Sequence, residues 1–356
     1  MNGSSPPRTI LALETSCDET AAAVVRDGRI IVANIVASQI EAHRRYGGVV
    51  PEVASRQHIL TLDTVVREAL ALLPGGLDEI DAVAATYGPG LAGALMTGLN
   101  MAKAIAWIRD LPLIGVNHIE AHIYANWLIP PQPAAVSEPA FPIVALVVSG
   151  GHTLLALLEA HGRLRILGQT RDDAAGEAFD KVARIMGLGF PGGPAIQQAA
   201  YNATERRLVL PRAWLRDSYD FSFSGLKTAV LHQMRAAGMT PAGARDAPGT
   251  TAAHPLVGEL AYAFQESVVD VLVSKACEAA QACAARSIIL AGGVAANARL
   301  RDELTRRAAV PVHVPPLALC TDNAAMIAAA AFFRYHAGVQ QGWALDVDPA
   351  LQLDAG

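Results

Sequence analysis

The same local pattern occurs twice in this chain, and it constrains the fold more than any other feature. Thr9–Leu13 and Thr20–Val25 are apolar, strand-like runs joined by a polar loop. Phe141–Val148 and Leu154–Leu158 repeat this arrangement around a second polar turn. Alternating strand-like and helix-like segments follow each unit, which is typical of an α/β protein. We therefore predict an internal duplication that gives two similar α/β lobes facing a cleft.

Proline residues at 130–133 mark a break between the two halves. We predict an N-terminal lobe of residues 8–128 plus 322–345, and a C-terminal lobe of residues 139–321 with helical insertions. A chain of 356 residues agrees with two domains of about 100–200 residues each. The Gly-, Ala-, Pro- and Thr-rich segment 236–254 is expected to be a flexible loop.

Hydrophobic periodicity and glycine or proline breaks define the remaining elements. The predicted helices are Val53–Leu73, Leu91–Ile108, His118–Leu128, Leu256–Cys283, Ala295–Ala308 and Asp322–Tyr335, with helical structure also expected over 172–200. The further predicted strands are Ile30–Val32, Ile80–Thr86, Leu113–Val116, Ser287–Leu290 and Val312–Val314.

Composition excludes several classes of protein. Hydrophobic residues make up 52% of the chain and the net charge is only −5, which excludes general disorder. The apolar runs are shorter than the roughly 20 residues of a membrane-spanning helix, and no secretory signal is visible. The four cysteines form no C-x-x-C pair, which argues against a zinc knuckle or a disulfide scaffold and favours the cytosol. The weak acidity argues against a free-standing nucleic-acid binder, although a local basic groove stays open.

Two histidines four residues apart, His118 and His122, occur in the motif HIEAH. On a helix they point the same way about one turn apart, which suits two imidazoles on one metal ion. The alternative is two polar residues on a solvated helix face. At about 100° per residue, Glu120 lies roughly 200° from both histidines, so it faces away from a metal that they bind. It cannot act as the general base of a zinc protease, whose motif is H-E-x-x-H.

Three glycine turns lie at the edges of predicted strands or helices: VSGGHT (148–153), FPGGP (190–194) and GGVAAN (292–297). Glycine lets the backbone approach a ligand closely and presents amide groups to an anion. A helix N-terminus, as expected after the third turn, attracts phosphate. For SGG alone an ordinary hairpin turn is the alternative. Together the three turns favour a nucleotide-like ligand held between the lobes.

Two acidic motifs have two interpretations each. In AGEAFDK, Glu177, Asp180 and Lys181 form either a solvated helical charge cluster or a site where a carboxylate binds a ribose. In CTDN, the spacing favours Thr321 or Asp322 as a helix N-cap. The alternative is that Asp322 turns its carboxylate to a metal.

Nine motifs in this order together resemble the tRNA N6-adenosine threonylcarbamoyltransferase family, once named O-sialoglycoprotein endopeptidases or glycoproteases. They are LETSCDET (13–20), GPGLAGAL (88–95), HIEAH (118–122), VSGGHT (148–153), GEAFDK (176–181), FPGGP (190–194), FSFSGLKTAV (221–230), AGGVAAN (291–297) and CTDNAAM (320–326). The resemblance covers about residues 9–335. Ala121 stands where bacterial members often have Gly, which leaves both histidines in place.

The resemblance implies the fold of actin, the sugar kinases and Hsp70: two ribonuclease-H-like lobes with an interlobe ligand cleft. It implies a cytoplasmic enzyme that transfers the threonylcarbamoyl group from threonylcarbamoyl-AMP to N6 of adenosine 37 in tRNAs reading codons that begin with A, releasing AMP. In bacteria it also implies a shorter paralogous subunit and a small P-loop ATPase as partners. We further expect a homodimer when the chain is isolated, and no membrane association.

Site residues are carried over from the matching motifs. The resemblance implies one divalent metal per subunit, with iron(II) favoured and zinc possible, on His118, His122 and Asp322. It makes Asp18 and Glu19 the acidic pair needed for activity, one of which would accept the proton of the amine. Donor-binding positions fall on Val147, Val148, Ser149, Gly150, Gly151, Asp180, Gly193 and Asn297.

Two other functions are alternatives: a sugar-kinase-like ATPase of the same superfold, and a metal-binding non-catalytic paralogue. Four arginine clusters are candidate contacts to tRNA or ordinary solvated surface pairs: Arg44-Arg45, Arg206-Arg207, Arg212 with Arg216, and Arg306-Arg307. The apolar stripe of Leu91–Ile108 is expected to pack either on the paralogous subunit or in the core of the chain.

Overall fold

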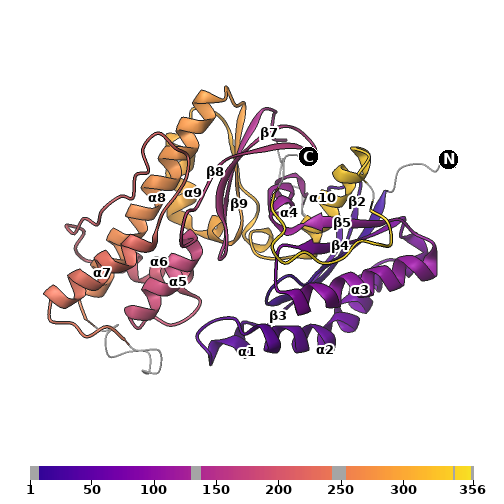
Figure 1. Cartoon of the computed structure of the whole chain (residues 1–356), viewed down its shortest axis with the longest axis horizontal. Helices are drawn as coiled ribbons and strands as arrows, with labels where there is room; N and C mark the ends of the chain where they lie inside the picture. Colours follow the sequence, from indigo (N-terminus) through magenta and orange to yellow (C-terminus); the bar gives the residue numbers. More distant parts are fainter. Residues whose placement is uncertain (1–7, 130–137, 243–253, 340, 354–356) are drawn as a thin grey trace.

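The computed structural model describes residues 8–129, 138–242, 254–339 and 341–353. Two five-stranded sheets form its framework. Figure 1 shows them side by side, with the N-terminal sheet and its helices on the right and the C-terminal sheet and its helices on the left. The architecture is α/β, as predicted.

The first sheet has the strand order β3-β2-β1-β4-β5. Its strands are β1 (Thr9–Glu14), β2 (Glu19–Arg26), β3 (Ile30–Ser38), β4 (Ala82–Gly88) and β5 (Leu113–Asn117). The pairs β1–β2 and β2–β3 are antiparallel, whereas β1–β4 and β4–β5 are parallel. The first three strands therefore form an antiparallel meander that opens a mixed sheet.

The second sheet repeats this topology, with the order β8-β7-β6-β9-β10. Its strands are β6 (Ile143–Val148), β7 (Thr153–Ala160), β8 (Arg163–Gln169), β9 (Ser287–Ala291) and β10 (Val312–His313). Again the first three strands are antiparallel and the last two are parallel additions. Identical strand order and direction in both sheets agree with the internal duplication inferred from the sequence.

The helices cover both faces of each sheet. They are α1 (Ile40–Arg44), α2 (Pro51–Leu70), α3 (Ala92–Arg109), α4 (His118–Tyr124), α5 (Ala175–Ile185), α6 (Gly192–Tyr201), α7 (Ser224–Ala236), α8 (Leu256–Ala282), α9 (Ala298–Arg307) and α10 (Ala324–His336). One hydrophobic core lies between the first sheet and α2 and α3, and another lies between the second sheet and α5 to α9.

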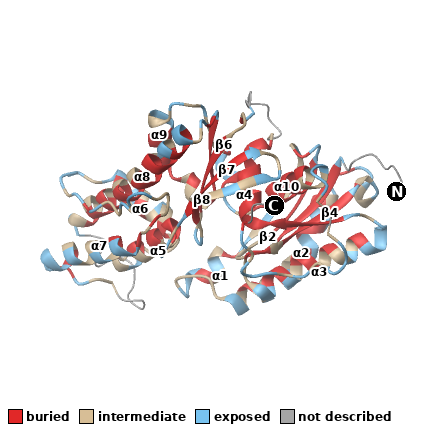
Figure 2. Ribbon diagram, turned by 45° about the horizontal axis from the view of Figure 1, so that its top comes forward, coloured by how far each residue is buried: buried red, intermediate tan, exposed pale blue. Residues whose placement is uncertain are grey.

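A third core joins the two sheets. Residues of α4 and α10 pack there against strands of both sheets, so these two helices lie in the middle of the molecule. Figure 2 shows them as buried segments between the sheets. Because α10 contacts all five strands of the first sheet, the C-terminal helix returns to the N-terminal half of the fold. The lobe boundaries at 8–128 plus 322–345 and at 139–321 stay a prediction.

Several elements differ from the sequence prediction. The helices α1 and α7 were not predicted. Strand β8 was not predicted, because its residues are mostly partly exposed and lack a continuous apolar run. The predicted helix His118–Leu128 ends at Tyr124 and continues as a short 3-10 turn. The predicted helix Ala295–Ala308 is split, since Asn297 has an extended backbone between a 3-10 turn and α9. The last helix begins at Ala324 rather than at Asp322.

Two further predictions concern single segments. Of the 236–254 segment, residues 243–253 lie outside the described part of the chain. Among the described helices, none combines the length and the apolar character needed to cross a bilayer.

Candidate active site

The helix that carries the two histidines begins directly at the end of a buried parallel strand. The side chain of Asn117, the last residue of β5, accepts hydrogen bonds from the backbone amides of Ile119 and Glu120, and this N-cap fixes the start of α4. His118 and His122 are only 8% and 1% exposed. The alternative of a solvated helix face is therefore wrong.

Asp322 approaches both histidines from the other end of the chain. Its Oδ1 lies 3.5 Å from His118 Nε2 and 3.3 Å from His122 Nε2. The predicted N-cap role of Thr321 or Asp322 is wrong, because Asn323 caps α10 and accepts a hydrogen bond from the Met326 amide. Because Asn323 is the N-cap, the Asp322 carboxylate is free to face the imidazoles.

The three side chains fit a metal ion. One ligand atom from each lies within 4.8 Å of the other two. Ligands bound at about 2.1 Å to one metal lie about 3.0–3.5 Å from each other, close to the distances from Asp322 Oδ1 to the two imidazoles. Within the described residues, neither ring nitrogen of buried His122 makes a hydrogen bond. A buried imidazole without a hydrogen bond is costly, and a metal ion between His122 and Asp322 would satisfy one of its nitrogens.

A residue that the sequence analysis did not single out, Glu14, supports this site from behind. Its fully buried carboxylate lies 3.1 Å from His118 Nδ1 and accepts hydrogen bonds from the Ser16 amide and the Thr86 hydroxyl. Carboxylates that hold the second nitrogen of a metal-binding histidine orient the ring and raise its basicity. Glu14 is an acidic residue at the end of an apolar strand, directly before the polar loop, and this position could have identified it from the sequence.

Charges in the site are strongly coupled. Burial opposes protonation of His118, but the carboxylates of Asp322 and Glu14 overcome it and raise the pKa of His118 to about 9. Burial likewise favours a neutral Asp322, yet His118 and His122 lower the pKa of its carboxyl to about 2. The site is therefore arranged for an anionic Asp322 facing positive charge, whether that charge is a proton or a cation.

Glu120 points away from this cluster, as the helical spacing predicted. It is buried against α10, where Arg334 Nη1 donates to its Oε2 at 2.6 Å. The carboxylate of Glu120 is therefore engaged in a structural ion pair. It offers no general base beside the histidines, which removes the protease mechanism.

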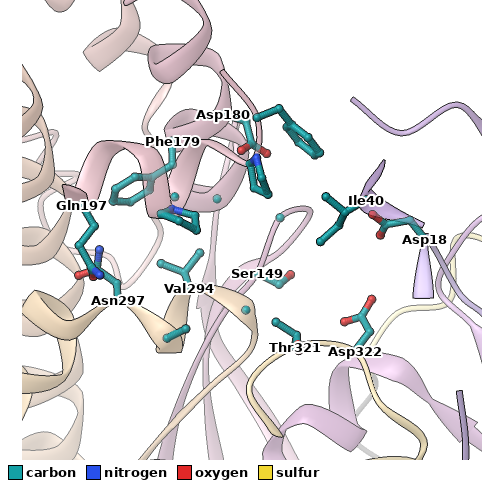
Figure 3. Close-up of a pocket in the computed structure, with 18 of the residues that line it drawn as sticks. Asp18, Ile40, Ser149, Phe179, Asp180, Gln197, Val294, Asn297, Thr321 and Asp322 are labelled. Carbon is teal, nitrogen blue, oxygen red and sulfur yellow. The ribbon is translucent and has the colours of Figure 1, made fainter. Parts of the chain in front are cut away.

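A cavity of about 410 Å³ begins at Asp322 and extends into the second half of the molecule. Figure 3 shows Asp18 and Asp322 at one end, Asn297 and Gln197 at the other, and Ser149 between them. Of the predicted donor-binding residues, the following line it: Ser149, Gly150, Asp180, Gly193 and Asn297. Its volume is in the range of small-molecule sites, about 300–1,000 Å³.

The remaining predicted donor positions lie elsewhere. Val147 and Val148 are fully buried strand residues that do not line the cavity. Gly151 lines a neighbouring cavity instead. Asn297 uses its side chain as the N-cap of α9 and also donates to Gln265 Oε1 at 2.9 Å. These residues therefore shape the backbone around the cavity more than they present free polar groups to it.

Glycines bring three backbone segments together at the cavity wall. Gly292 has a φ of 87°, and a Cβ there would lie 2.5 Å from the carbonyl oxygen of Val148. A Cβ on Gly176 would lie 2.5 Å from the carbonyl oxygen of Ser149. The glycine turns found in the sequence thus pack the ends of β6 and β9 against the start of α5.

Acidic groups crowd the end of the cavity nearest the histidines. Burial, and then the charge of Asp322, raises the pKa of Asp18. Burial raises the pKa of Glu19 to about 7, with added repulsion from Asp18 and Asp322, although the Ser38 hydroxyl donates to Glu19 Oε1 at 2.8 Å. Burial also raises the pKa of Asp180, whose Oδ1 accepts from the Gly192 amide. Glu19, whose pKa is near neutrality, is therefore suited to proton transfer.

A second cavity of about 620 Å³ adjoins the first. It shares with the first cavity the residues Asp18, Ser149, Gly150, Asp180, Phe190 and Asp322. Its own lining includes His118 and His152, the 47–49 segment after α1, and Lys181 and Arg184 of α5. The two cavities therefore adjoin along these shared residues, of which Asp322 belongs to the metal cluster.

Comparison with known proteins identifies the family. Residues 30–329 match the family model of tRNA N6-adenosine threonylcarbamoyltransferase. The chain belongs to this family. The Thermomicrobium roseum member is 54% identical over 353 residues, covering 97% of this chain and 96% of that protein. The Dehalococcoides mccartyi member is 52% identical over 344 residues, covering 97% of this chain and 99% of that protein.

Solved structures support the same fold at low sequence identity. HypF from T. kodakarensis superposes with a TM-score of 0.60 at 13% identity, over 93% of this chain and 48% of that chain. Component A of the Acidaminococcus fermentans (R)-2-hydroxyglutaryl-CoA dehydratase gives 0.50 at 13% identity, over 94% and 99% of the two chains. The predicted actin, sugar kinase and Hsp70 superfold is thereby confirmed for this member of the threonylcarbamoyltransferase family.

Proposed function

We propose that this chain transfers a threonylcarbamoyl group from threonylcarbamoyl-AMP to N6 of adenosine 37 in tRNAs that read codons beginning with A. The observation that carries the proposal is a buried His118–His122–Asp322 cluster at the junction of two cavities, in a chain 52–54% identical to curated members of the family. Transfer of an acyl group between two large substrates needs such a shared reaction point.

The reaction is acyl transfer at the carbamoyl carbon. The N6 lone pair of adenosine attacks this carbon, a new C–N bond forms, and the bond from carbon to the phosphate oxygen breaks. AMP leaves with the electron pair, and the amine loses one proton to a base. Because the adenine amine is a weak nucleophile, the enzyme must position the partners and stabilise charge on the carbonyl and phosphate oxygens.

The donor fits the first cavity with its acyl end toward Asp322. Ser149 and the Gly150 amide would hold the phosphate or the carbonyl oxygen. Asp180 and the turn at Gly193 would bind the ribose hydroxyls. The adenine would lie toward Asn297, where the lining includes Val294 and other apolar groups that suit an aromatic base.

A metal would be held by His118, His122 and Asp322, and Glu14 would orient His118. When bound it supplies Lewis-acid polarisation of donor oxygens and a fixed template for them. Two imidazoles and one carboxylate suit iron(II), which we favour, or zinc.

Proton removal would fall to Asp18 or Glu19. Both line the first cavity and lie at the end where the acyl group is expected. The pKa of Glu19, near 7, allows it to accept a proton from the attacking amine at neutral pH and to return it to solvent.

The transfer enzyme is expected to work in the cytoplasm with other proteins. We propose the outer face of α2 and α3 as the surface for a shorter paralogous subunit. The inner face of α3 packs in the core of the chain, which is one of the two alternatives for its apolar stripe. The apolar side chains of Ile59 and Leu60 on α2 and Met96 on α3 are exposed. A homodimer of the isolated chain would use the same face. A small P-loop ATPase is the third expected protein.

The arginine clusters do not by themselves form a tRNA surface. Arg44 pairs with Glu41, and Arg207 pairs with Glu205. The other pairs are Arg212 and Arg307 with Asp270, and Arg306 with Glu303. These contacts favour ordinary surface ion pairs for most clusters, in agreement with a need for partner proteins in binding tRNA.

A reconstituted assay tests the function. The metal-loaded protein is incubated with tRNA, threonine, bicarbonate and ATP, together with a donor synthase and the partner proteins, and nucleosides are analysed by mass spectrometry. We expect threonylcarbamoyladenosine only when this chain is present. ATP turnover by the chain alone, without any modified nucleoside, would instead support the sugar-kinase-like ATPase. Absence of both activities would support a non-catalytic paralogue.

A further inference from the structure

The second cavity is the part of the cleft that the donor does not use. Its volume, about 620 Å³, is sufficient for a nucleoside. It reaches the same metal cluster through His118 and Asp322. An amine in this cavity would therefore reach Asp322, which also lines the first cavity.

Acyl transfer requires this separation. The attacking nitrogen and the leaving phosphate must both lie near the acyl carbon, yet the two substrates cannot occupy the same volume. If the nucleotide fills the first cavity as far as Asn297, the second cavity is the space beside the carbonyl that remains for the acceptor. The residues common to both cavities, including Ser149 and Asp322, then surround the carbon that changes partners.

Arg45 and Tyr46, which directly precede the cavity-lining segment 47–49, have features that suit an unpaired nucleic-acid strand. The Tyr46 ring is 50% exposed, and the Arg45 guanidinium lies 4.7 Å from its centre. Within the described residues Arg45 makes no ion pair, unlike neighbouring Arg44. Exposed aromatic rings and guanidinium planes are the surfaces on which proteins stack bases of single-stranded RNA.

The segment that carries Tyr46 is fixed across the cleft. Arg184 of α5 donates a hydrogen bond to the carbonyl oxygen of Gly47, which joins the α1–α2 segment to the second half of the molecule. Figure 1 shows this segment extending from α1 toward α5. Lys181 lies on the same wall, where it pairs with Glu177 and Asp173, and Arg184 adds a second positive charge to the cavity lining.

We propose that the second cavity receives the acceptor adenosine of the RNA, and that Tyr46 and Arg45 stack on an adjacent unpaired base. The inference rests on the proposed function and adds to it the route by which the acceptor enters. The RNA recognised here is a single-stranded loop, since a duplex cannot present a free base to a cavity. Gly47 and Gly48 line this cavity, and neither has a side chain that would fill it.

Steady-state kinetics with the reconstituted enzyme test the stacking contact. We expect Tyr46→Ala and Arg45→Ala each to raise the KM for tRNA by about 5-fold or more, as loss of a stacked base does, with an unchanged KM for threonylcarbamoyl-AMP. Tyr46→Phe should retain the wild-type KM, because stacking uses the ring. Tyr201→Ala is the matched control, since Tyr201 is exposed at the end of α6. A wild-type KM for tRNA in Tyr46→Ala and Arg45→Ala would overturn the stacking proposal.

Two cavity-filling variants test the assignment of the cavities. A Cβ on Gly48 would meet only the end of the Arg184 side chain, at 3.7 Å, and a Cβ on Gly193 would meet nothing within 4 Å. Gly48→Leu should abolish transfer to tRNA while binding of a non-reactive donor analogue persists. Gly193→Leu should instead weaken analogue binding. Loss of analogue binding in Gly48→Leu, or undiminished transfer by it, would overturn the assignment. If the proposed function itself were wrong, the wild-type enzyme would show no transfer to tRNA.

Discussion

Glu14 Oε2 lies 3.1 Å from His118 Nδ1, on the side of the imidazole away from Asp322. The Ser16 hydroxyl lies at the same distance from that nitrogen. This arrangement leaves His118 Nε2 as the nitrogen available to a metal. The orientation of the first ligand is therefore set by a residue on β1, a hundred residues earlier in the chain.

Glu14→Gln should weaken metal binding without removing a ligand. We expect a loss of about 10- to 100-fold in affinity, because the amide is a poorer acceptor and lowers the basicity of His118. Chelator competition measures this change. Glu79→Gln, on the surface far from the site, is the control. Unchanged metal affinity in Glu14→Gln would show that the carboxylate does not support the ligand.

Gly176→Ala should disturb the turn that is proposed to hold the donor phosphate. The added methyl group would lie 2.5 Å from the Ser149 carbonyl oxygen, so the turn or α5 must move. We expect donor-analogue affinity to fall by about 10-fold or more, since sub-ångström placement matters in such sites. Calorimetric titration measures it.

Gly225→Ala provides the control for this substitution. Gly225 lies inside α7, and a Cβ there would meet nothing within 4 Å. The variant should bind the analogue as the wild type does and unfold at an equal or higher temperature. Equal analogue affinity in both variants would contradict the proposed role of the turn.

The rate of transfer should rise with pH through about 7. Glu19 has its pKa raised to about 7 chiefly by burial, and only its deprotonated form can accept the amine proton. Ser38→Ala removes a hydrogen bond that favours the carboxylate, so the midpoint should move to higher pH. Glu19→Gln should lower the rate and flatten the profile. A profile that is unchanged in Glu19→Gln would assign the proton to another group.

The raised pKa of Glu19 also predicts how the stability of the protein depends on pH. A pKa of about 7 in the folded state, against 4.5 in the unfolded chain, means that the folded protein retains a proton on Glu19. This contribution to stability is fully present below about pH 4.5 and is lost as the pH rises through about 7. In urea titrations Glu19→Gln should therefore gain stability relative to the wild type as the pH increases over this interval.

Lys275→Met should destabilise the long segment between α6 and α7. The buried ammonium group of Lys275 donates to the backbone carbonyls of Leu215, Ser218 and Asp220 at 2.5–2.9 Å. Leaving these acceptors without a donor should lower the free energy of unfolding by about 2–5 kcal/mol. Urea denaturation measures the loss, with Lys103→Met on α3 as the control. A loss of less than about 1 kcal/mol would show that water replaces the ammonium group without cost.

Repeated strand patterns made the fold predictable from sequence. Each half begins with an apolar strand, a polar turn and a returning strand, and these features are local. Strand β8 escaped prediction because its pairing with β7, rather than its own composition, makes it a strand. The burial of α4 and α10 between the sheets is a tertiary property that local periodicity does not contain.

For the site, helical spacing correctly placed His118 and His122 together and turned Glu120 away. Spacing failed at Asp322, because the local sequence CTDN offers several cap residues and only the structure shows that Asn323 caps the helix. The FSFSG motif has no role in the proposed reaction. Its serines instead donate to Asp172, which anchors the start of α7.

Diffraction at a metal absorption edge tests the central claim most directly. Crystals of the protein are grown with iron(II) or zinc and a non-reactive analogue of threonylcarbamoyl-AMP. The account predicts one anomalous peak bound by His118, His122 and Asp322, with the AMP moiety in the cavity that ends at Asn297. A metal bound at other residues, or an analogue that occupies the cavity lined by Gly48 and Arg184, would contradict it.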